Sequence, residues 1–198
     1  MTELAVPRIA VVIVNYRTAD MTIAHFAALK RECGDFAGAT VYIVDNASPG
    51  DDAAKLAAFA ATEPMVRFMA SPDNRGFGAG NNIALREALK TEPAFDYVLL
   101  LNPDAWPRDG ALKTLADFLA ATPLAGVVGP RLEHEDGVMQ ASGFRFFSVL
   151  SEFDWCARPG FISAMLRGRA VIPPQPDEPA PFDWLSGAAL LFRREVFE

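Results

Sequence analysis

Short, continuous runs of apolar residues alternate with longer amphipathic stretches over the first two-thirds of the chain. Such runs have the length and continuity of strands that are buried on both faces of a parallel sheet. They predict four strands, at residues 9–14, 41–44, 66–69 and 97–101. The amphipathic stretches predict four helices, one from its cap at about Asp20 to Gly34 and the others at residues 53–61, 81–90 and 112–119. The alternation predicts an α/β fold with a Rossmann-like, mainly parallel sheet and helices on both faces.

The pattern changes after the fourth helix. Residues 127–128 and 185–192 predict two more strands, and residues 138–147, which contain Gly and Phe, are compatible with an antiparallel strand. The proline-rich residues 173–181 predict a stiff extended loop. Residues 193–198 resemble the first turn of an amphipathic helix that has no C-cap. We therefore expect the sequence to be C-terminally truncated within a domain.

Composition narrows the class of protein. The 198 residues fit one domain, and a hydrophobic fraction of 51% supports a sizeable core. The formal net charge of −7 argues against nucleic-acid binding, which needs a basic face. Two cysteines, Cys33 and Cys156, are too few for a disulfide framework. The start of the chain lacks the features of a signal peptide or membrane span, so we expect a cytoplasmic protein. Association with the inner face of a membrane and homo-oligomer formation are left open.

Polar residues follow each of the first four predicted strands. In an open parallel sheet, ligands bind outside the carboxyl ends of the strands, so these groups are expected to converge on one edge. The four groups are Asn15-Tyr16-Arg17, Asp45-Asn46, Asn74-Arg75-Gly76 and Asn102-Pro103-Asp104.

Four of these side chains suit a nucleoside diphosphate. Tyr16 can stack on a base, and Asp45 or Asn46 can pair with a pyrimidine imide. Arg75 can neutralise a diphosphate and bind it through its forked guanidinium. Other roles stay open: core packing for Tyr16, a turn or helix cap for Asp45, and a solvated surface position for Arg75.

Asp104 is the strongest candidate for a metal ligand. Mg²⁺ and Mn²⁺ prefer hard oxygen ligands and are often held by one or two carboxylates together with phosphate oxygens. Asp104 comes directly after a buried strand, with Pro103 restricting the backbone before it. The alternative is a cap for the next helix, although Asp109 is better placed for that role.

The glycine-rich segment at residues 76–80 raises a different possibility, a nucleotide-cofactor oxidoreductase. The GxGxxG register fails, however, because Asn81 or Ile83 stands where the third glycine belongs. The segment also follows the third strand, whereas the dinucleotide fingerprint normally follows the first.

Taken together, these residues resemble the family-2 glycosyltransferases of the GT-A fold, in particular the bacterial rhamnosyltransferase-like branch. The resemblance covers nearly the whole chain. Its segments are VVIVNYRT (11–18), VYIVDNAS (41–48), NRGFGAGNN (74–82), YVLLLNPDA (97–105) and WLSGAALLFRREVF (184–197). It implies one GT-A domain, with a nucleotide-sugar-binding half at about 1–105 and an incomplete acceptor-side part at about 106–198.

The resemblance also implies roles for individual residues. Base-binding positions match Asn15, Tyr16, Asp45 and Asn46, with Arg17 beside them. The nucleotide and diphosphate loop matches Asn74, Arg75 and Gly76. The metal motif matches Asn102 and Asp104, with Asp104 as its only carboxylate. The sugar and acceptor segment matches Trp184, Ser186, Gly187 and Ala188.

The activity implied is inverting, metal-assisted sugar transfer from a dTDP- or UDP-sugar, with dTDP-rhamnose as one donor, to a glycan or lipid-linked acceptor. Mg²⁺ or Mn²⁺ is the implied cofactor. The family's general base lies beyond the SGA…RR segment, so we expect this chain to bind donor but to lack the base. Asp183 is a weak candidate for that role, and Glu152 and Asp154 lie in a segment of uncertain structure. A nucleotide-sugar-binding scaffold without activity remains the alternative.

Overall fold

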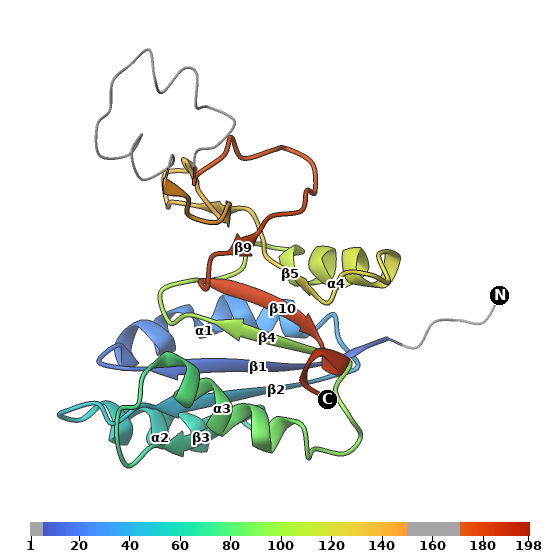
Figure 1. Cartoon of the computed structure of the whole chain (residues 1–198). Helices are drawn as coiled ribbons and strands as arrows, with labels where there is room; N and C mark the ends of the chain where they lie inside the picture. Colours follow the sequence, from blue (N-terminus) through green and yellow to red (C-terminus); the bar gives the residue numbers. More distant parts are fainter. Residues whose placement is uncertain (1–5, 150–170) are drawn as a thin grey trace. The chain divides into compact units, whose positions relative to one another are not determined.

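The computed structural model describes residues 6–149 and 171–198. Its contacts divide the chain into two compact units, one made of Met1–Val128 and Gly187–Glu198 and the other of Gly129–Ser186. The first unit contains a six-stranded sheet (Figure 1). Its strand order is β3 (Val66–Ala70), β2 (Gly38–Asp45), β1 (Arg8–Asn15), β4 (Tyr97–Leu101), β10 (Ala189–Arg193) and β5 (Val127–Val128).

The direction of the strands sets where a ligand can bind. β1 pairs in parallel with β2 and with β4, and β2 pairs in parallel with β3. β10 is antiparallel to both of its neighbours, β4 and β5. The chain passes outward from β1 to β3 and then returns to the other side of β1 for β4. The strand order therefore reverses at β1, which is the position where open α/β sheets bind ligands at their carboxyl edge.

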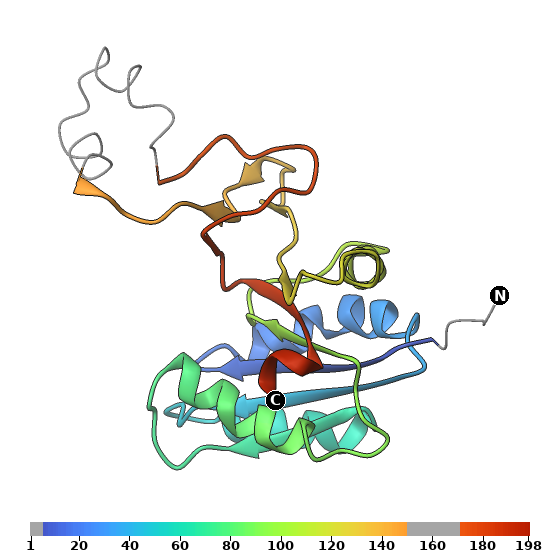
Figure 2. The same ribbon diagram turned by 45° about the vertical axis from the view of Figure 1, so that its right-hand side comes forward.

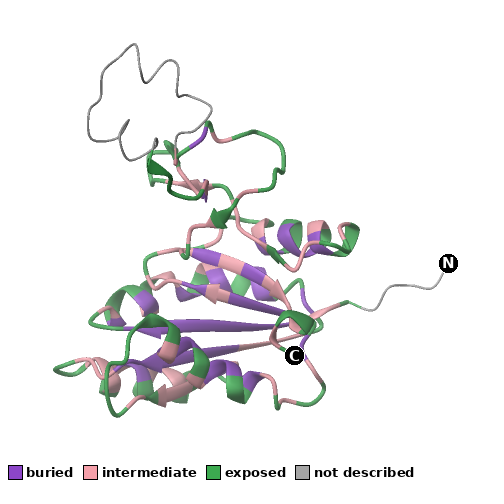
Figure 3. Ribbon diagram, viewed as in Figure 1, coloured by how far each residue is buried: buried purple, intermediate pink, exposed green. Residues whose placement is uncertain are grey.

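Helices cover both faces of this sheet, as the alternation predicted (Figure 2). The helices are α1 (Ala19–Cys33), α2 (Asp52–Thr62), α3 (Phe77–Ala88) and α4 (Ala111–Ala121), and the 3-10 turn η2 (Arg194–Phe197) follows β10. Successive strand residues point to opposite faces. Val11 therefore packs with α1, α2 and α4, whereas Val12 packs with α3. β1 and β2 are buried along most of their length (Figure 3).

Close contact between α3 and β1 depends on a glycine. A Cβ built on Gly80 would lie 2.7 Å from Val14 Cγ1 and 3.2 Å from Val14 Cγ2. Because such distances are well inside van der Waals contact, the helix can approach the strand this closely only without a side chain at residue 80. Gly80 therefore determines the distance between the start of α3 and the end of β1.

The second unit contains four short strands among its described residues. β6 (Leu132–Glu133) pairs with β7 (Met139–Gln140), and β8 (Gly143–Phe144) pairs with β9 (Trp184–Leu185), both antiparallel. The single strand that we considered at 138–147 is thus two strands in different sheets. The predicted strand at 185–192 is also divided, because β9 belongs to this unit and β10 to the first. Residues 173–181 form no helix or strand, as predicted.

Two helix starts differ from the prediction. α1 begins at Ala19 with Thr18 as its N-cap residue, so the expectation that Asp20 caps it was wrong. α3 begins at Phe77 rather than near Asn81, because Gly76, at φ +87°, turns the chain directly into the helix. No described helix has the length and apolar character required to cross a bilayer.

Candidate active site

The carboxyl ends of β1 and β2 bring two predicted site residues side by side. Asn15 and Asp45 are register partners in the parallel pair. Asp45 is also the register partner of Ala70, the last residue of β3, which leads into the loop containing Asn74 and Arg75. β4 ends at Leu101, next to β1, and is followed by Asn102. The four polar groups therefore leave neighbouring strands at one edge of the sheet.

Asn15 lies in the protein interior, with no exposed surface. Its Nδ2 is 2.8 Å from Asp45 Oδ1, 3.1 Å from Asp52 Oδ2 and 3.2 Å from Ser48 Oγ. Its Oδ1 accepts a hydrogen bond of 2.9 Å from Thr18 Oγ1. Both ends of the amide are thus engaged within the protein, which makes Asn15 an organising residue of this edge.

Asp45 closes the turn after β2. It is 2% exposed, and its Oδ2 accepts a hydrogen bond from Ser48 N at 3.0 Å while Oδ1 faces Asn15. Ala47 takes the left-handed conformation, with φ 57°, within this turn. The turn role that we considered for Asp45 is therefore present. Each carboxylate oxygen has a second lone pair, so this role leaves acceptor capacity on the same group.

Asn46 connects β2 to the start of α3. Its Nδ2 donates to Asn74 Oδ1 at 2.9 Å and to the carbonyl oxygen of Gly76 at 3.3 Å. Asn74 Oδ1 also accepts from Gly76 N at 2.9 Å. The Oδ1 of Asn46 is buried and has no hydrogen-bond partner, and the same holds for Asn81 Oδ1 on α3. These two amide oxygens are acceptors whose desolvation is not compensated within the described chain.

Tyr16 and Arg17 project from the turn between β1 and α1. Tyr16 is 44% exposed, which rules out ordinary core packing and leaves its ring accessible for stacking. The Arg17 guanidinium carbon lies 5.5 Å from the centroid of that ring, a cation–π distance. Arg75 is exposed and forms an ion pair of 2.8 Å with Asp73, whose hydrogen bond raises the pKa of Arg75. A diphosphate would compete with Asp73 for this side chain.

Asp104 is exposed and has no hydrogen-bond or ion-pair partner within the described residues. The backbone before Asp104 is held in place, because Asn102 N donates a hydrogen bond of 2.9 Å to the carbonyl oxygen of Ala188, the residue just before β10. In residues 6–149 and 171–198, no three His, Cys, Asp or Glu side chains gather in a metal-binding group. The Asp104 carboxylate and the side-chain oxygen of Asn102, two residues before it, are hard oxygen donors of the kind that Mg²⁺ and Mn²⁺ take together with phosphate oxygens and water.

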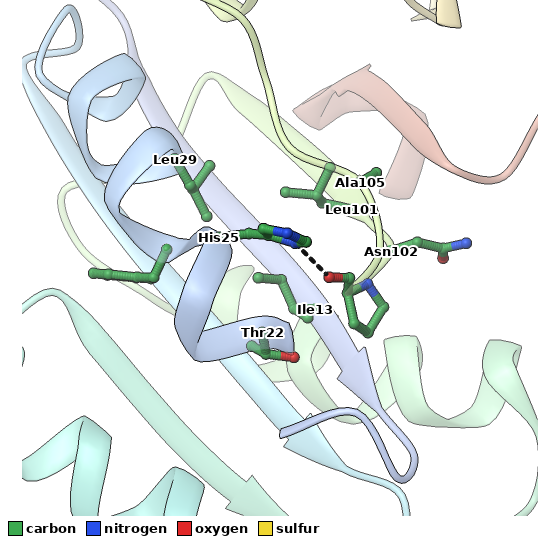
Figure 4. Close-up of a pocket in the computed structure, with 9 residues that line it drawn as sticks. Ile13, Thr22, His25, Leu29, Leu101, Asn102 and Ala105 are labelled. Atoms are coloured by element: carbon green, nitrogen blue, oxygen red, sulfur yellow. Dashed lines mark hydrogen bonds between the residues drawn. The ribbon is translucent and has the colours of Figure 1, made fainter. Parts of the chain in front are cut away.

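A small pocket beside this loop reveals a contact that the sequence did not suggest (Figure 4). It is lined mainly by apolar side chains of α1, β1 and the end of β4. His25 of α1 points into it, with Nδ1 3.4 Å from the carbonyl oxygen of Pro103. The imidazole also packs on Trp106, with ring centroids 4.1 Å apart. α1 therefore contacts the Asp104 loop on both sides of Asp104 itself.

The residues that we assigned to the sugar and acceptor fall in both units. Trp184 belongs to the second unit, as does Asp183, the weak candidate for the general base, whose Oδ2 accepts from Phe146 N at 2.9 Å. Trp184 donates from Nε1 to the carbonyl oxygen of Arg145 and stacks on Phe144 with centroids 4.0 Å apart. These contacts give both residues structural roles in the β8–β9 region.

Ser186 and Ala188 of this segment take part in backbone hydrogen bonds. Ser186 N donates to the carbonyl oxygen of Ser142 in the second unit. Gly187 and Ala188 belong to the first unit, and a Cβ at Gly187 would meet no atom within 4 Å. Glu152, Asp154 and Cys156 lie outside the described residues.

Comparison with known proteins gives consistent results. Residues 10–170 match the sequence profile of glycosyl transferase family 2. An N-acetylglucosaminyl-diphospho-decaprenol L-rhamnosyltransferase of Mycobacterium tuberculosis is 30% identical over 148 residues, which are 68% of this chain and 46% of that protein. The chain thus spans about half the length of the curated relatives it matches.

Two solved structures show the same fold at low sequence identity. The mannosyltransferase PcManGT from Pyrobaculum calidifontis, in complex with GDP-Man and Mn²⁺, aligns with a TM-score of 0.60 and 19% identity, over 98% of this chain and 46% of that one. The S. aureus TarS fragment 1-349 in complex with UDP-GlcNAc aligns with a TM-score of 0.51 and 18% identity, over 68% of this chain and 38% of that one. These likenesses confirm the predicted GT-A fold.

Proposed function

Because this chain belongs to glycosyl transferase family 2, we propose that it binds a nucleoside-diphosphate sugar at the carboxyl edge of its sheet and serves sugar transfer to an acceptor hydroxyl. The observation that carries the proposal is the hydrogen bond between Asn15 and Asp45 at the ends of two adjacent central strands. A buried carboxylate at the position where the strand order reverses suits the polar edge of a nucleobase. The family match favours this reading over the nucleotide-cofactor oxidoreductase.

The base is proposed to lie between Tyr16 and Asp45. The accessible ring of Tyr16 offers a stacking face, and the Asp45 carboxylate offers an acceptor for the imide N–H of a pyrimidine. Asn46 supports this arrangement through its bonds to Asn74 and Gly76, which tie the loop before α3 to the end of β2.

The diphosphate is proposed to lie between Arg75 and Asp104. Asp104, with Asn102 beside it, would hold a divalent cation, and Arg75 would exchange Asp73 for a phosphate oxygen. A bound Mg²⁺ or Mn²⁺ would offset the negative charge of the leaving diphosphate. The exposure of both Asp104 and Arg75 leaves them accessible to such a ligand.

Rhamnose is our first candidate for the sugar, and a glycan or lipid-linked molecule for the acceptor. The 30% identical relative, whose name describes rhamnosyl transfer to a decaprenol-linked acceptor, supports this choice. In the inverting displacement that we propose, the acceptor hydroxyl attacks the anomeric carbon as the diphosphate departs from the opposite face. A general base takes the hydroxyl proton during the attack, and this proton transfer typically increases the reaction rate about 10²- to 10⁴-fold.

Calorimetry with dTDP, UDP and GDP, each with Mn²⁺, tests the proposal. We expect at least one nucleoside diphosphate to bind, and dTDP most tightly. Asp45→Ala should weaken it by about 1.5–3 kcal/mol through loss of one charge-assisted hydrogen bond, while inorganic pyrophosphate binding stays nearly unchanged. Absence of binding by all three nucleotides would refute the proposal. Binding without sugar transfer, when the donor and a lipid-linked acceptor are supplied to the full-length protein, would favour the scaffold alternative.

A further inference from the structure

Asp52 connects three elements at the candidate site, although no motif in the sequence marked it. It is the first residue of α2. Its Oδ2 accepts a hydrogen bond from Asn15 Nδ2, at the end of β1, and another from Ala19 N, at the start of α1, both at 3.1 Å. One carboxylate oxygen therefore fixes the end of a central strand and the first turn of the following helix.

The orientation of the Asn15 amide is set by its hydrogen-bond partners. Thr18 Oγ1 donates to Asn15 Oδ1, so Nδ2 must face the carboxylates of Asp45 and Asp52. If the amide were turned over, its carbonyl oxygen would lie against both carboxylates. Nδ2 has two hydrogens and three acceptors, which are Asp45 Oδ1 at 2.8 Å, Asp52 Oδ2 at 3.1 Å and Ser48 Oγ at 3.2 Å, so two of the acceptors share one hydrogen.

Asp52 is suited to remain ionised in this position. Partial burial alone would raise the pKa of Asp52. The hydrogen bonds from Asn15 and from the Ala19 N–H outweigh that effect, and the Lys55 charge adds to them, so the pKa lies below its ordinary value. An ionised acceptor forms a stronger hydrogen bond to the Asn15 amide than a neutral one would.

We propose that Asp52 is a positioning residue for nucleotide binding, which holds Asn15 and the first turn of α1 so that Asp45 and Tyr16 face the base. The proposal rests on the proposed function. Tyr16 lies in the turn that Asp52 anchors through Ala19, and Arg17 N is bound to Ser48 Oγ in the same network. Without Asp52, the Asn15 amide loses one of its two carboxylate partners and the turn loses its anchor on α2.

Three variants test this role. Asp52→Ala removes both hydrogen bonds. Asp52→Asn keeps an oxygen that can accept both but removes the charge. Asp51→Ala is the matched control, because Asp51 is the neighbouring carboxylate and is exposed, and its side chain makes a 3.5 Å ion pair with Lys55 but, within the described residues, no cap hydrogen bond to α2. Each protein is titrated with dTDP and with pyrophosphate, in the presence of Mn²⁺, well below its melting temperature.

We expect Asp52→Ala to weaken dTDP binding by about tenfold, as if one charge-assisted hydrogen bond between the displaced Asp45 and the base were lost, and to leave pyrophosphate binding within about twofold. Asp52→Asn should restore most of the dTDP affinity, and Asp51→Ala should match the wild type. The backbone amide resonance of Ser48, which donates to Asp45, should shift in Asp52→Ala and not in Asp51→Ala. This shift reports a displaced Asp45, which a general loss of stability would not single out.

Three results would overturn the inference. They are unchanged dTDP affinity in Asp52→Ala, an equal loss of affinity for dTDP and pyrophosphate, and a Ser48 resonance that stays in place. A wild-type protein that binds no nucleoside diphosphate would instead refute the proposed function, and the inference with it.

Discussion

Asn15 and Asp45 stand opposite each other at the carboxyl ends of β1 and β2, joined by a hydrogen bond of 2.8 Å between Nδ2 and Oδ1. Both side chains are buried, so the bond lies in the interior where an unpaired carboxylate is costly. The site is thus built on a polar pair in the core of the sheet, and exposed side chains such as Tyr16 are arranged around it.

Replacing the amide should destabilise the protein. A leucine side chain is similar in size to asparagine, but the Asn15→Leu variant leaves Asp45 and Asp52 without their shared hydrogen-bond donor. We expect a loss of about 1.5–3 kcal/mol in the free energy of unfolding, as for a hydrogen bond to a charged group. Urea denaturation measures it, with Asn82→Leu on the exposed side of α3 as the control. Equal stability of the two variants would show that the buried pair contributes little.

Two glycines of α3 should respond in opposite directions to the same substitution. Gly80→Ala places a Cβ 2.7 Å from Val14 Cγ1, so α3 must move away from β1 at a cost of about 1–3 kcal/mol. Gly78→Ala meets no atom within 4 Å and should stabilise the helix by about 0.5–1 kcal/mol. Thermal unfolding of both variants checks the pair. A stabilised Gly80→Ala would contradict the close packing of α3 on β1.

Cys33 should be unreactive while the protein is folded. Burial, with a smaller contribution from the neighbouring Glu32 carboxylate, raises the pKa of the Cys33 thiol from 9.0 to about 12. Because the thiolate is the nucleophile, alkylation at pH 8 should be slow until the chain unfolds. Iodoacetamide labelling followed by peptide mass spectrometry measures this, and equal labelling of Cys33 with and without urea would contradict it.

The same shift has a consequence for stability at high pH. Below pH 9 the thiol is neutral in both the folded and the unfolded chain, and its contribution to stability is complete. Between pH 9 and about 12 the unfolded chain releases the proton first, so the free energy of unfolding should fall with rising pH. The free energy of unfolding of Cys33→Ala should fall less over this range. An identical fall in the variant and the wild type would show that other groups cause it.

The fold was largely predictable because the central strands are continuous apolar runs, as in Tyr97–Leu101, whose predicted and observed bounds agree. Helix starts were harder to predict, because they depend on groups distant in sequence. Ala19 N is bound by Asp52, 33 residues later, and this contact rather than Asp20 marks where α1 begins. The split of residues 184–193 into β9 and β10 depends on two different partner strands, which the sequence pattern does not specify.

The site was predictable at the level of which strand ends carry polar residues, since that follows from the alternation of strands and helices. The contacts within it were not. Asn15 was expected to face the ligand, and the structure shows its amide engaged by Asp45, Asp52 and Thr18. His25, which contacts the Asp104 loop, lies within an ordinary amphipathic helix and carried no distinguishing pattern.

In the proposed function, a metal-bound nucleoside diphosphate occupies the carboxyl edge of the sheet at Asp104. Calorimetric titration of dTDP with and without Mn²⁺ tests it most directly, on the wild type, Asp104→Ala and the control Asp109→Ala, an exposed carboxylate that pairs with Arg31. We expect Mn²⁺ to strengthen dTDP binding in the wild type and in Asp109→Ala. In Asp104→Ala this gain should fall by at least about 10-fold, since even loss of a group supporting a metal ligand costs that much. An equal gain from Mn²⁺ in all three proteins would contradict the claim.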